Sequence, residues 1–263
     1  MSDNIPHEIV REILERLPVK TLGVCLCVCK SWHALITSAS FITNHFSKTH
    51  KNDINKGRRF LFKHYDLNDK VRFSLHLDND SFEKVRDLEF PLKRYYPGFR
   101  MVGYCNGVLC LSNIRVSSNF FLWNPSVQQK CVSLPPHPVS TSPGYHSHAV
   151  GFGFDSLSSN FKVVMLSFGG QSSAIQANVC SLSTNSWNDI SARAIPYKVI
   201  NCRNSVFVNG AIHWIASSGK IKRRNEIKWG RDADSILMFD VSHDSMRCSI
   251  KCVFQNFGSE STV

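Results

Sequence analysis

The sequence predicts a mainly β protein that begins with a small helical region. Three observations lead to this fold class. Apolar residues recur at helical spacing within residues 1–47 and not beyond them. From Arg58 onward, short apolar runs alternate with a period of two and are separated by turn residues. Within that second part, a strand–turn–strand unit returns about every 58 residues.

The composition excludes several classes of protein. The chain has 263 residues, 43% of them hydrophobic and 11% aromatic, so it can bury one large or two modest cores and is not intrinsically disordered. No window approaches the roughly 18 apolar residues of a membrane span, and the N-terminus lacks the pattern of a signal peptide. We therefore expect a soluble protein of the nucleus or cytoplasm, or of both, with no membrane partner.

The cysteines and the net charge give weaker indications. The ten cysteines replace small apolar residues, as in the runs 24–29 and 109–111, which predicts buried free thiols in a reducing compartment. The formal net charge of +11 is compatible with nucleic acid, an anionic membrane or an acidic protein partner. The sign of the charge does not choose among these partners.

The N-terminal region is predicted to contain two helical stretches. The first carries one apolar stripe, formed by Ile9, Val10, Ile13, Leu14 and Leu17. Pro6 suits its first turn and Pro18 ends it. The second runs from Val19 to Ser38 with an interruption near Gly23. About forty residues form a core too small to be stable without a partner or a neighbouring domain.

The β region is predicted to contain repeated pairs of hairpins. Residues 61–65 and 71–77 form a first hairpin. The repeated strand–turn–strand unit has equivalent positions at Trp123, Leu182 and Asp240, and a weaker copy spans 75–82. In the runs 102–111 and 206–214, Asn-Gly supplies the positive φ values of a type I′ turn, and 151–166 occupies the corresponding place between them. Two hairpins per unit form a four-stranded sheet, and radial repetition of such sheets is a propeller.

The N-terminal residues resemble the F-box. The matching strings run from Ile5 to Leu22 and from Cys27 to Ile36, and they include Leu-Pro-Val-Lys and Val-Cys-Lys-Ser-Trp. The resemblance implies a trihelical module that binds the Skp-type adaptor of a Skp–cullin–F-box ubiquitin ligase. It also implies residues shared between core and adaptor interface: Ile5, Pro6, Ile9, Leu14, Leu17, Pro18, Val28, Lys30 and Trp32.

The β region resembles the F-box-associated domain of plant F-box proteins, a kelch-like propeller. The strings that carry this resemblance are Cys105–Leu111, Leu122–Ser126, Gly151–Asp155, Asn185–Trp187 and Val208–Trp214. The implied organisation is an F-box at 1–47, a linker at 48–58 and an F-box-associated β domain at 59–263. Family members continue well beyond the equivalent of Asp240, so we expect a shortened C-terminus and an incomplete propeller.

Residues that could carry other chemistry form weak patterns. Cys25, Cys29 and His33 are four apart, but zinc needs a fourth ligand, and we expect no metal, no cofactor and no catalytic residues. The basic stretch 220–231 contains the weak target-binding candidates Lys222, Arg223, Arg224 and Trp229. It could contact phosphate groups or an acidic protein, but a solvated loop is the favoured interpretation, so nucleic acid is disfavoured as a partner.

The leading hypothesis is a non-catalytic substrate receptor, in which the helices bind the adaptor, and through it the cullin, and the β domain captures an unidentified target protein. One alternative is a basic β protein that binds nucleic acid or another ligand. A second alternative is a shortened family member that binds the adaptor and no target.

Overall fold

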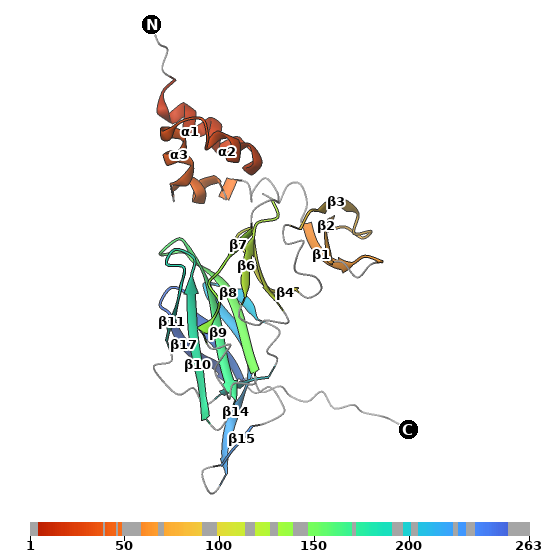
Figure 1. The fold of residues 1–263 in the computed structure, drawn as a ribbon, viewed down its shortest axis with the longest axis vertical. Helices are drawn as coiled ribbons and strands as arrows, with labels where there is room; N and C mark the ends of the chain where they lie inside the picture. The colour runs from red at the N-terminus through yellow and green to blue at the C-terminus, as the bar shows by residue number, and fades with distance from the viewer. Residues whose placement is uncertain are drawn as a thin grey trace. The chain divides into compact units, whose positions relative to one another are not determined.

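The computed structural model describes residues 5–38, 40–45, 47–48, 59–67, 71–90, 99–113, 119–126, 131–138, 147–169, 172–190, 197–200, 205–222, 226–229 and 235–251. Helices at the N-terminus are followed by a mainly β region, as the sequence predicts, and this region forms four antiparallel sheets (Figure 1). The chain divides into two compact units, residues 1–98 with 123–131 and residues 99–122 with 132–263. Among the described helices, none is both long and apolar enough to cross a membrane.

The helical region contains α1 (His7–Arg16), α2 (Val19–Cys25) and α3 (Lys30–Thr37), and residues 40–45 are also helical. Pro18 separates α1 from α2, as predicted. The predicted interruption near Gly23 is wrong, because Gly23 lies inside α2 and the chain turns after Cys25 instead. The reason is a cap: Cys29 is extended, and its thiol accepts a hydrogen bond from Trp32 N at 3.5 Å, which starts a new helix.

The helical core is small, as its length dictates. It contains five buried side chains, Leu14, Leu22, Cys25, Ile36 and Phe41. His45 stacks on Phe41, and its Nε2 lies 2.8 Å from the carbonyl oxygen of Leu17, which ties residues 40–45 to the end of α1. Glu15 is buried and pairs with Arg11 at 3.0 Å and with Lys48 at 2.5 Å. These polar contacts hold α1 in place beside a core that contains few apolar residues.

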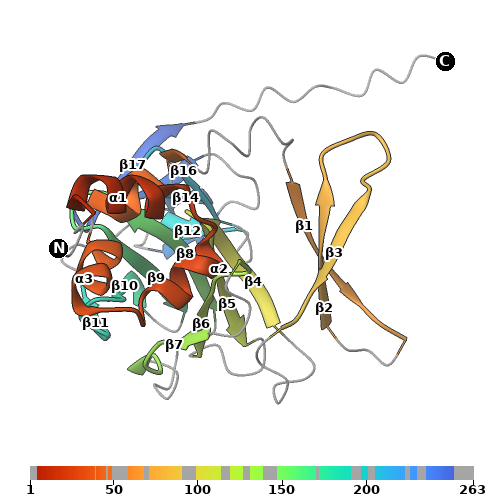
Figure 2. The ribbon, with the colours of Figure 1, turned by 90° about the horizontal axis from the view of Figure 1, so that it is seen from above.

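The first sheet has the order β1 (Arg59–Tyr65), β2 (Val71–Leu77) and β3 (Lys84–Leu88) (Figure 2). The predicted hairpin of residues 61–65 and 71–77 is therefore confirmed. The register places Lys63 opposite Phe73 and Tyr65 opposite Val71. The face that bears Val71 and Phe73 is buried at these residues, and Phe73 contacts the ring of Trp123 at a centroid distance of 5.1 Å.

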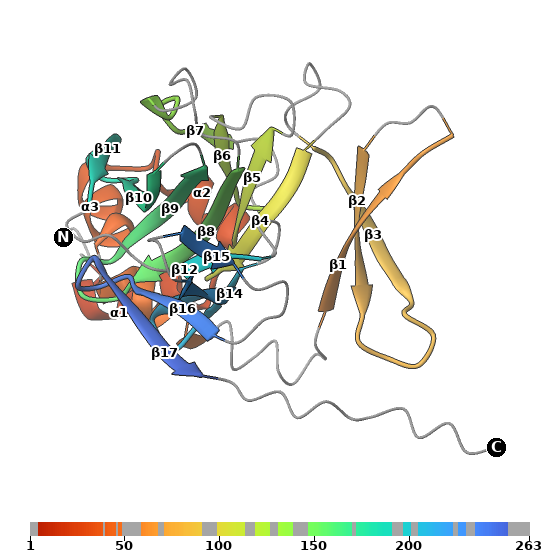
Figure 3. The ribbon, with the colours of Figure 1, turned by 90° about the horizontal axis from the view of Figure 1, so that it is seen from below.

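Three further sheets form the second unit, except for Trp123 at the end of β6 and Cys131 at the start of β7, which belong to the first unit (Figure 3). One has the order β4 (Phe99–Cys105), β5 (Val108–Asn113), β6 (Phe120–Trp123) and β7 (Cys131–Ser133). The next consists of β8 (Ser147–Asp155), β9 (Asn160–Gly169), β10 (Ser172–Ser181) and β11 (Ser186–Asp189). The predicted repeat is confirmed. Trp123 ends β6, Leu182 follows β10 and Asp240 ends β16, and each of these strands pairs with the next strand in the chain.

The last of these sheets has six strands instead of the predicted four. It has the order β12 (Tyr197–Val199), β14 (Ala211–Lys222), β16 (Ser235–Asp240) and β17 (Ser245–Lys251), and both β13 (Val206–Val208) and β15 (Glu226–Trp229) also pair with β14. The expectation of a loop for the basic stretch is wrong in part. Gly219–Lys222 pairs with Glu226–Trp229, so β14 extends into an additional hairpin. Its strands contain Ile221 and Ile227 opposite each other, an alternation that the run of cations obscured in the sequence.

Two kinds of turn join the strands. At Asn106-Gly107 and Asn209-Gly210 all four φ values are positive, which confirms the predicted type I′ turns. The longer turns place one residue in the left-handed region directly before the returning strand: Ser159, Asn185 and Asp244. Short polar side chains tolerate this conformation best, and the sequence provides them there.

The sheet of β8–β11 has a hydrophobic core on each face. One core contains Val150 and Phe152 with residues of β5 and β6, and the other contains Ala149 with residues of β14 and β16. Gly151 and Gly153 lie on the same side of β8 as Ala149. A Cβ atom at Gly151 would be 2.4 Å from Ile212 Cγ2 and 2.6 Å from Trp214 Cζ2. The glycines of this motif therefore permit close packing of β8 against β14.

Gly151→Ala is expected to destabilise the second unit by about 2–3 kcal/mol, because the added methyl group overlaps a buried tryptophan. Gly103→Ala is the matched control, since its Cβ would meet Phe152 at 3.4 Å, an ordinary van der Waals contact. Urea denaturation of both variants checks this expectation. Equal stability of the two variants would contradict it.

Candidate functional site

The apolar side chains of α1 divide between two faces. Leu14 is fully buried, and Val10 and Leu17 pack against the same core. Ile9 and Ile13 are instead 49% and 51% exposed, and Ile5, just before the helix, is 61% exposed. Successive spacings of four residues put the two helical isoleucines on one side of α1. We call Ile5, Ile9 and Ile13 the isoleucine stripe.

Other segments of the helical region also expose apolar side chains. Val24 in α2 is 71% exposed, Val28 in the following turn 60%, and Ile42 in residues 40–45 56%. A module of this size can bury few of its apolar residues, and Ile5, Ile9, Ile13, Val24, Val28 and Ile42 remain exposed. Exposed aliphatic side chains at this density are typical of a protein interface.

The residues singled out from the F-box resemblance fall into three classes of burial. Ile5, Pro6, Ile9, Pro18, Val28 and Lys30 are exposed, Leu17 and Trp32 are partly buried, and Leu14 is fully buried. Leu14 therefore supports the core and is unavailable to a partner in the folded module. Ile13, Val24 and Ile42 were missed, although the spacing from Ile5 through Ile9 to Ile13 was visible in the sequence.

The cysteines of the helical region differ in their burial. Cys25 is buried, whereas Cys27 and Cys29 are exposed, so the expectation of buried thiols fails for these two. In the part of the chain that the structure describes, no three His, Cys, Asp or Glu side chains gather around a common point. Cys27, Cys29, Lys30 and His33, with Leu26, line an open pocket of about 350 Å³. A hydrogen bond with Ser31, and a second from Trp32 N, lower the pKa of the Cys29 thiol.

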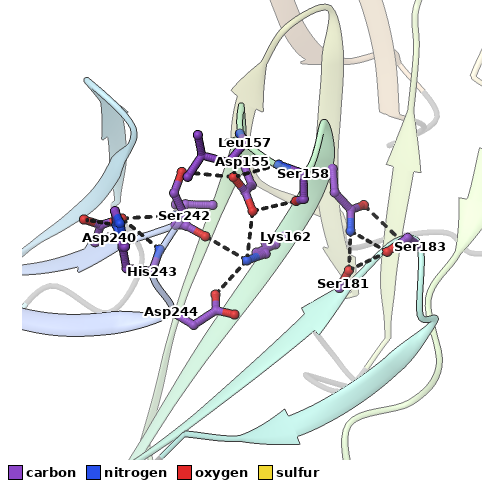
Figure 4. Close-up of polar contacts among 12 residues, drawn as sticks. Asp155, Leu157, Ser158, Lys162, Ser181, Ser183, Asp240, Ser242, His243 and Asp244 are labelled. Carbon is purple, nitrogen blue, oxygen red and sulfur yellow. Dashed lines mark hydrogen bonds and ion pairs between the residues drawn. The ribbon is translucent and has the colours of Figure 1, made fainter. Parts of the chain in front are cut away.

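The β domain contains a buried ionic network that joins two of its turns (Figure 4). Asp155 at the end of β8 and Lys162 in β9 are 3% and 7% exposed, and their charged groups lie 3.2 Å apart. Lys162 Nζ also donates to Val241 O at 2.8 Å and to Asp244 Oδ1 at 2.9 Å, in the turn between β16 and β17. Ser242 Oγ donates to Asp155 Oδ1 from the same turn. The ammonium group thus fixes one turn against the other.

Asp155 also organises its own turn. Its Oδ1 accepts hydrogen bonds from Leu157 N and Ser158 N, and its Oδ2 accepts one from Ser158 Oγ at 2.6 Å. Asp240 accepts from Ser242 N and His243 N in the same way. Burial opposes the charged form of Asp155, but the hydrogen bonds from Ser158, Ser242 and Lys162 outweigh it and hold the pKa far below its usual range.

Two of the weak target-binding candidates of the basic stretch, Lys222 and Trp229, lie in the additional hairpin. Lys222 ends β14 and Trp229 ends β15, and Gly219 is opposite Trp229 in the register. Arg223 and Arg224 lie outside the described residues. The backbone therefore brings Lys222 and Trp229 to opposite ends of one short ladder rather than together.

Asp155→Asn is expected to lower the free energy of unfolding by about 3 kcal/mol at pH 7, because it leaves Lys162 without its buried partner. The folded-state pKa of Asp155 is depressed, so its contribution is complete above its unfolded-state pKa of about 3.9 and decreases as the pH falls below that value. The difference in the free energy of unfolding between wild type and variant should therefore be smaller at pH 3 than at pH 7.

Asp240→Asn is the matched control, because Asp240 caps a similar turn without a buried lysine, and it should cost less than about 1 kcal/mol. Urea denaturation at both pH values provides the measurement. If the difference in the free energy of unfolding between wild type and Asp155→Asn does not change with pH, an ionic origin of the stabilisation by Asp155 is excluded.

Comparison with known protein families agrees with both resemblances. The F-box domain family matches residues 2–44, and the family described as the F-box associated beta propeller domain matches residues 59–263. An F-box/kelch-repeat protein of Arabidopsis thaliana is 28% identical over 254 residues, which cover 93% of this chain and 64% of the relative. The F-box protein CPR1 of Arabidopsis thaliana is 30% identical, over 80% of this chain and 53% of the relative.

A third Arabidopsis thaliana F-box protein is 27% identical over 81% of this chain and 54% of its own length. The chain thus spans between about half and two thirds of these relatives. The family match over residues 59–263 covers most of the chain, and the F-box match covers most of the remainder. On this evidence the chain belongs to the F-box proteins that carry an F-box-associated domain.

Proposed function

We propose that this protein is a substrate-recognition subunit of a Skp–cullin–F-box ubiquitin ligase. In this function the helical region binds a Skp-type adaptor, and the adaptor connects it to a cullin. The β domain binds a target protein. The observation that carries the proposal is the isoleucine stripe, an exposed aliphatic surface on a module that belongs to the F-box family.

The isoleucine stripe has the chemistry of an adaptor-binding surface. Ile9 and Ile13 project from one side of a helix, which is how amphipathic helices fill an apolar groove of a partner. Burying two or three such side chains contributes several kcal/mol, by roughly 25 cal/mol per Å² of apolar surface. The buried Leu14 and the Glu15 pairs with Arg11 and Lys48 keep α1 oriented, so the stripe is preformed.

Catalysis by such a subunit needs no active-site residues of its own. Holding a target beside the conjugating enzyme raises the effective concentration of target lysines, and proximity alone accelerates transfer by orders of magnitude. The rigid connection of the turns in the β domain through Lys162 suits this function, because it presents a defined surface to the target. The protein is therefore proposed to be non-catalytic.

Ile9→Asp and Ile13→Asp are each expected to weaken binding to a purified Skp-type adaptor by at least tenfold, because a carboxylate would be buried in an apolar interface. Titration calorimetry measures the affinity, and far-UV circular dichroism verifies the helices. His7→Asp is the matched control, since two residues place His7 on roughly the opposite side of α1.

Leu14→Asp separates docking from folding. Leu14 is fully buried, so this variant should lose both helical signal and adaptor binding. Undiminished affinity in Ile9→Asp and Ile13→Asp, with the helices intact, would rule out the isoleucine stripe as the adaptor surface.

A further inference from the structure

The sheet of β1–β3 exposes three phenylalanine rings on one face. Phe60, Phe62 and Phe82 are 42%, 40% and 49% exposed, and their ring centroids lie 5.7–6.4 Å apart. The register pairs Phe60 with His76 and Phe62 with Ser74, so these strand residues share one face. The other face bears the buried Val71 and Phe73, so the three rings lie outside that core. We call Phe60, Phe62 and Phe82 the phenylalanine cluster.

The backbone of Phe82 is strained. Its φ is +47°, in the left-handed region, where the longer turns elsewhere carry Ser159, Asn185 or Asp244. A bulky side chain is unfavourable there. The hydrogen bonds that hold the turn include one from Glu83 N to Asn79 Oδ1 at 3.0 Å and one between His76 Nδ1 and Phe82 O at 2.6 Å. The turn therefore keeps a half-exposed phenyl ring in a position better suited to asparagine. Backbone strain of this kind is often found at binding sites.

The surroundings of the cluster have the opposite charge to the rest of the chain. Residues 59–90 contain six Lys or Arg and seven Asp or Glu, in a protein of net charge +11. The turn beside Phe82 carries Asp78, Asp80 and Glu83, all exposed. Among the ion pairs between described residues, none includes these three carboxylates, whereas the nearby Lys84 pairs with Asp87 at 2.7 Å. An acidic turn thus borders an aromatic surface.

We propose that the phenylalanine cluster and the acidic turn bind a short basic segment of the target protein, in which Lys or Arg residues alternate with apolar ones. This inference rests on the proposed function of the β domain as target receptor. Apolar side chains and the aliphatic stems of Lys or Arg pack on the rings, and the cationic groups meet Asp78, Asp80 and Glu83 and the ring faces. A nucleic acid is disfavoured because its phosphates would be repelled by the same carboxylates.

The test uses the full chain, with and without a Skp-type adaptor, to select peptides from a phage-displayed library of random 12-residue sequences. Selected peptides are synthesised and their affinities measured by fluorescence polarisation. We expect sequences enriched in Lys or Arg alternating with Leu, Phe or Trp. Affinity should fall as salt is added, because ion pairs with an exposed turn are screened.

Variants separate binding from folding. Phe82→Asn should retain or raise the thermal unfolding temperature, since asparagine adopts positive φ more readily, and yet weaken peptide binding by roughly tenfold, the loss typical of an aromatic anchor. The double variant Asp78→Asn with Asp80→Asn should weaken binding severalfold and reduce its salt dependence. Leu67→Ser is the matched control, because Leu67 is a fully exposed apolar residue next to β1, and its affinity should equal that of wild type.

The inference is overturned if the library yields no binder, if it yields acidic peptides, or if Phe82→Asn binds the selected peptides as tightly as wild type. Binding of a single-stranded oligonucleotide that Phe82→Asn abolishes would overturn it in favour of a nucleic-acid surface. Adaptor affinity, measured in the same preparations, tests the proposed function separately. Adaptor binding without peptide binding removes this inference alone, and peptide binding without adaptor binding removes the ligase function.

Discussion

The second unit depends on a close approach between two strands that glycine makes possible. Where β8 meets β14, the indole of Trp214 and the side chain of Ile212 occupy the space that a side chain at position 151 would need. Ala149, Gly151 and Gly153 keep one face of β8 small, while Val150 and Phe152 fill the core on the other face. Because β8 belongs to the sheet with a core on each side, both cores require this alternation of small and large residues.

The helical region is governed by a shortage of apolar residues. Its core uses five buried side chains, whereas Ile9 and Ile13 of α1 are about half exposed. Leu14 follows Ile13 directly and comes five residues after Ile9. It nevertheless lies on a different surface from both isoleucines, because each residue advances about 100° around the helix. The same ten-residue helix can therefore be part of a core and part of an interface.

Local patterns in the sequence predict much of this fold. The Asn-Gly turns, the hairpin of β1 and β2 and the repeated units around Trp123, Leu182 and Asp240 all depend on residues near one another in the chain. The additional strand β12 was not predicted, because its pairing with β14 is a matter of tertiary context. Strand β15 was missed for a local reason, because the run of cations obscured the alternation in its hairpin with β14. The reason for Gly151 also lies with distant residues, since only Trp214 and Ile212 show why a side chain is excluded.

The candidate sites were predicted less completely. Motif position identified Ile5 and Ile9 but could not separate them from the buried Leu14, because burial within a small module depends on how the helices cross. Lys162 and Asp244 are far apart in sequence, so their pairing had no local signal. The strain at Phe82 is equally hidden, because a phenylalanine in a run of polar turn residues gives no indication of its φ.

The turns fixed by Asp155 and Asp240 have a consequence for how such a domain can diversify. In each, the carboxylate at the end of a strand accepts the amide hydrogens of the turn, so the backbone path is determined by one residue. The side chain of Leu157, which is exposed in the first of these turns, contributes little to that path. Mutations there can change the outer chemistry of the domain while its scaffold is inherited intact.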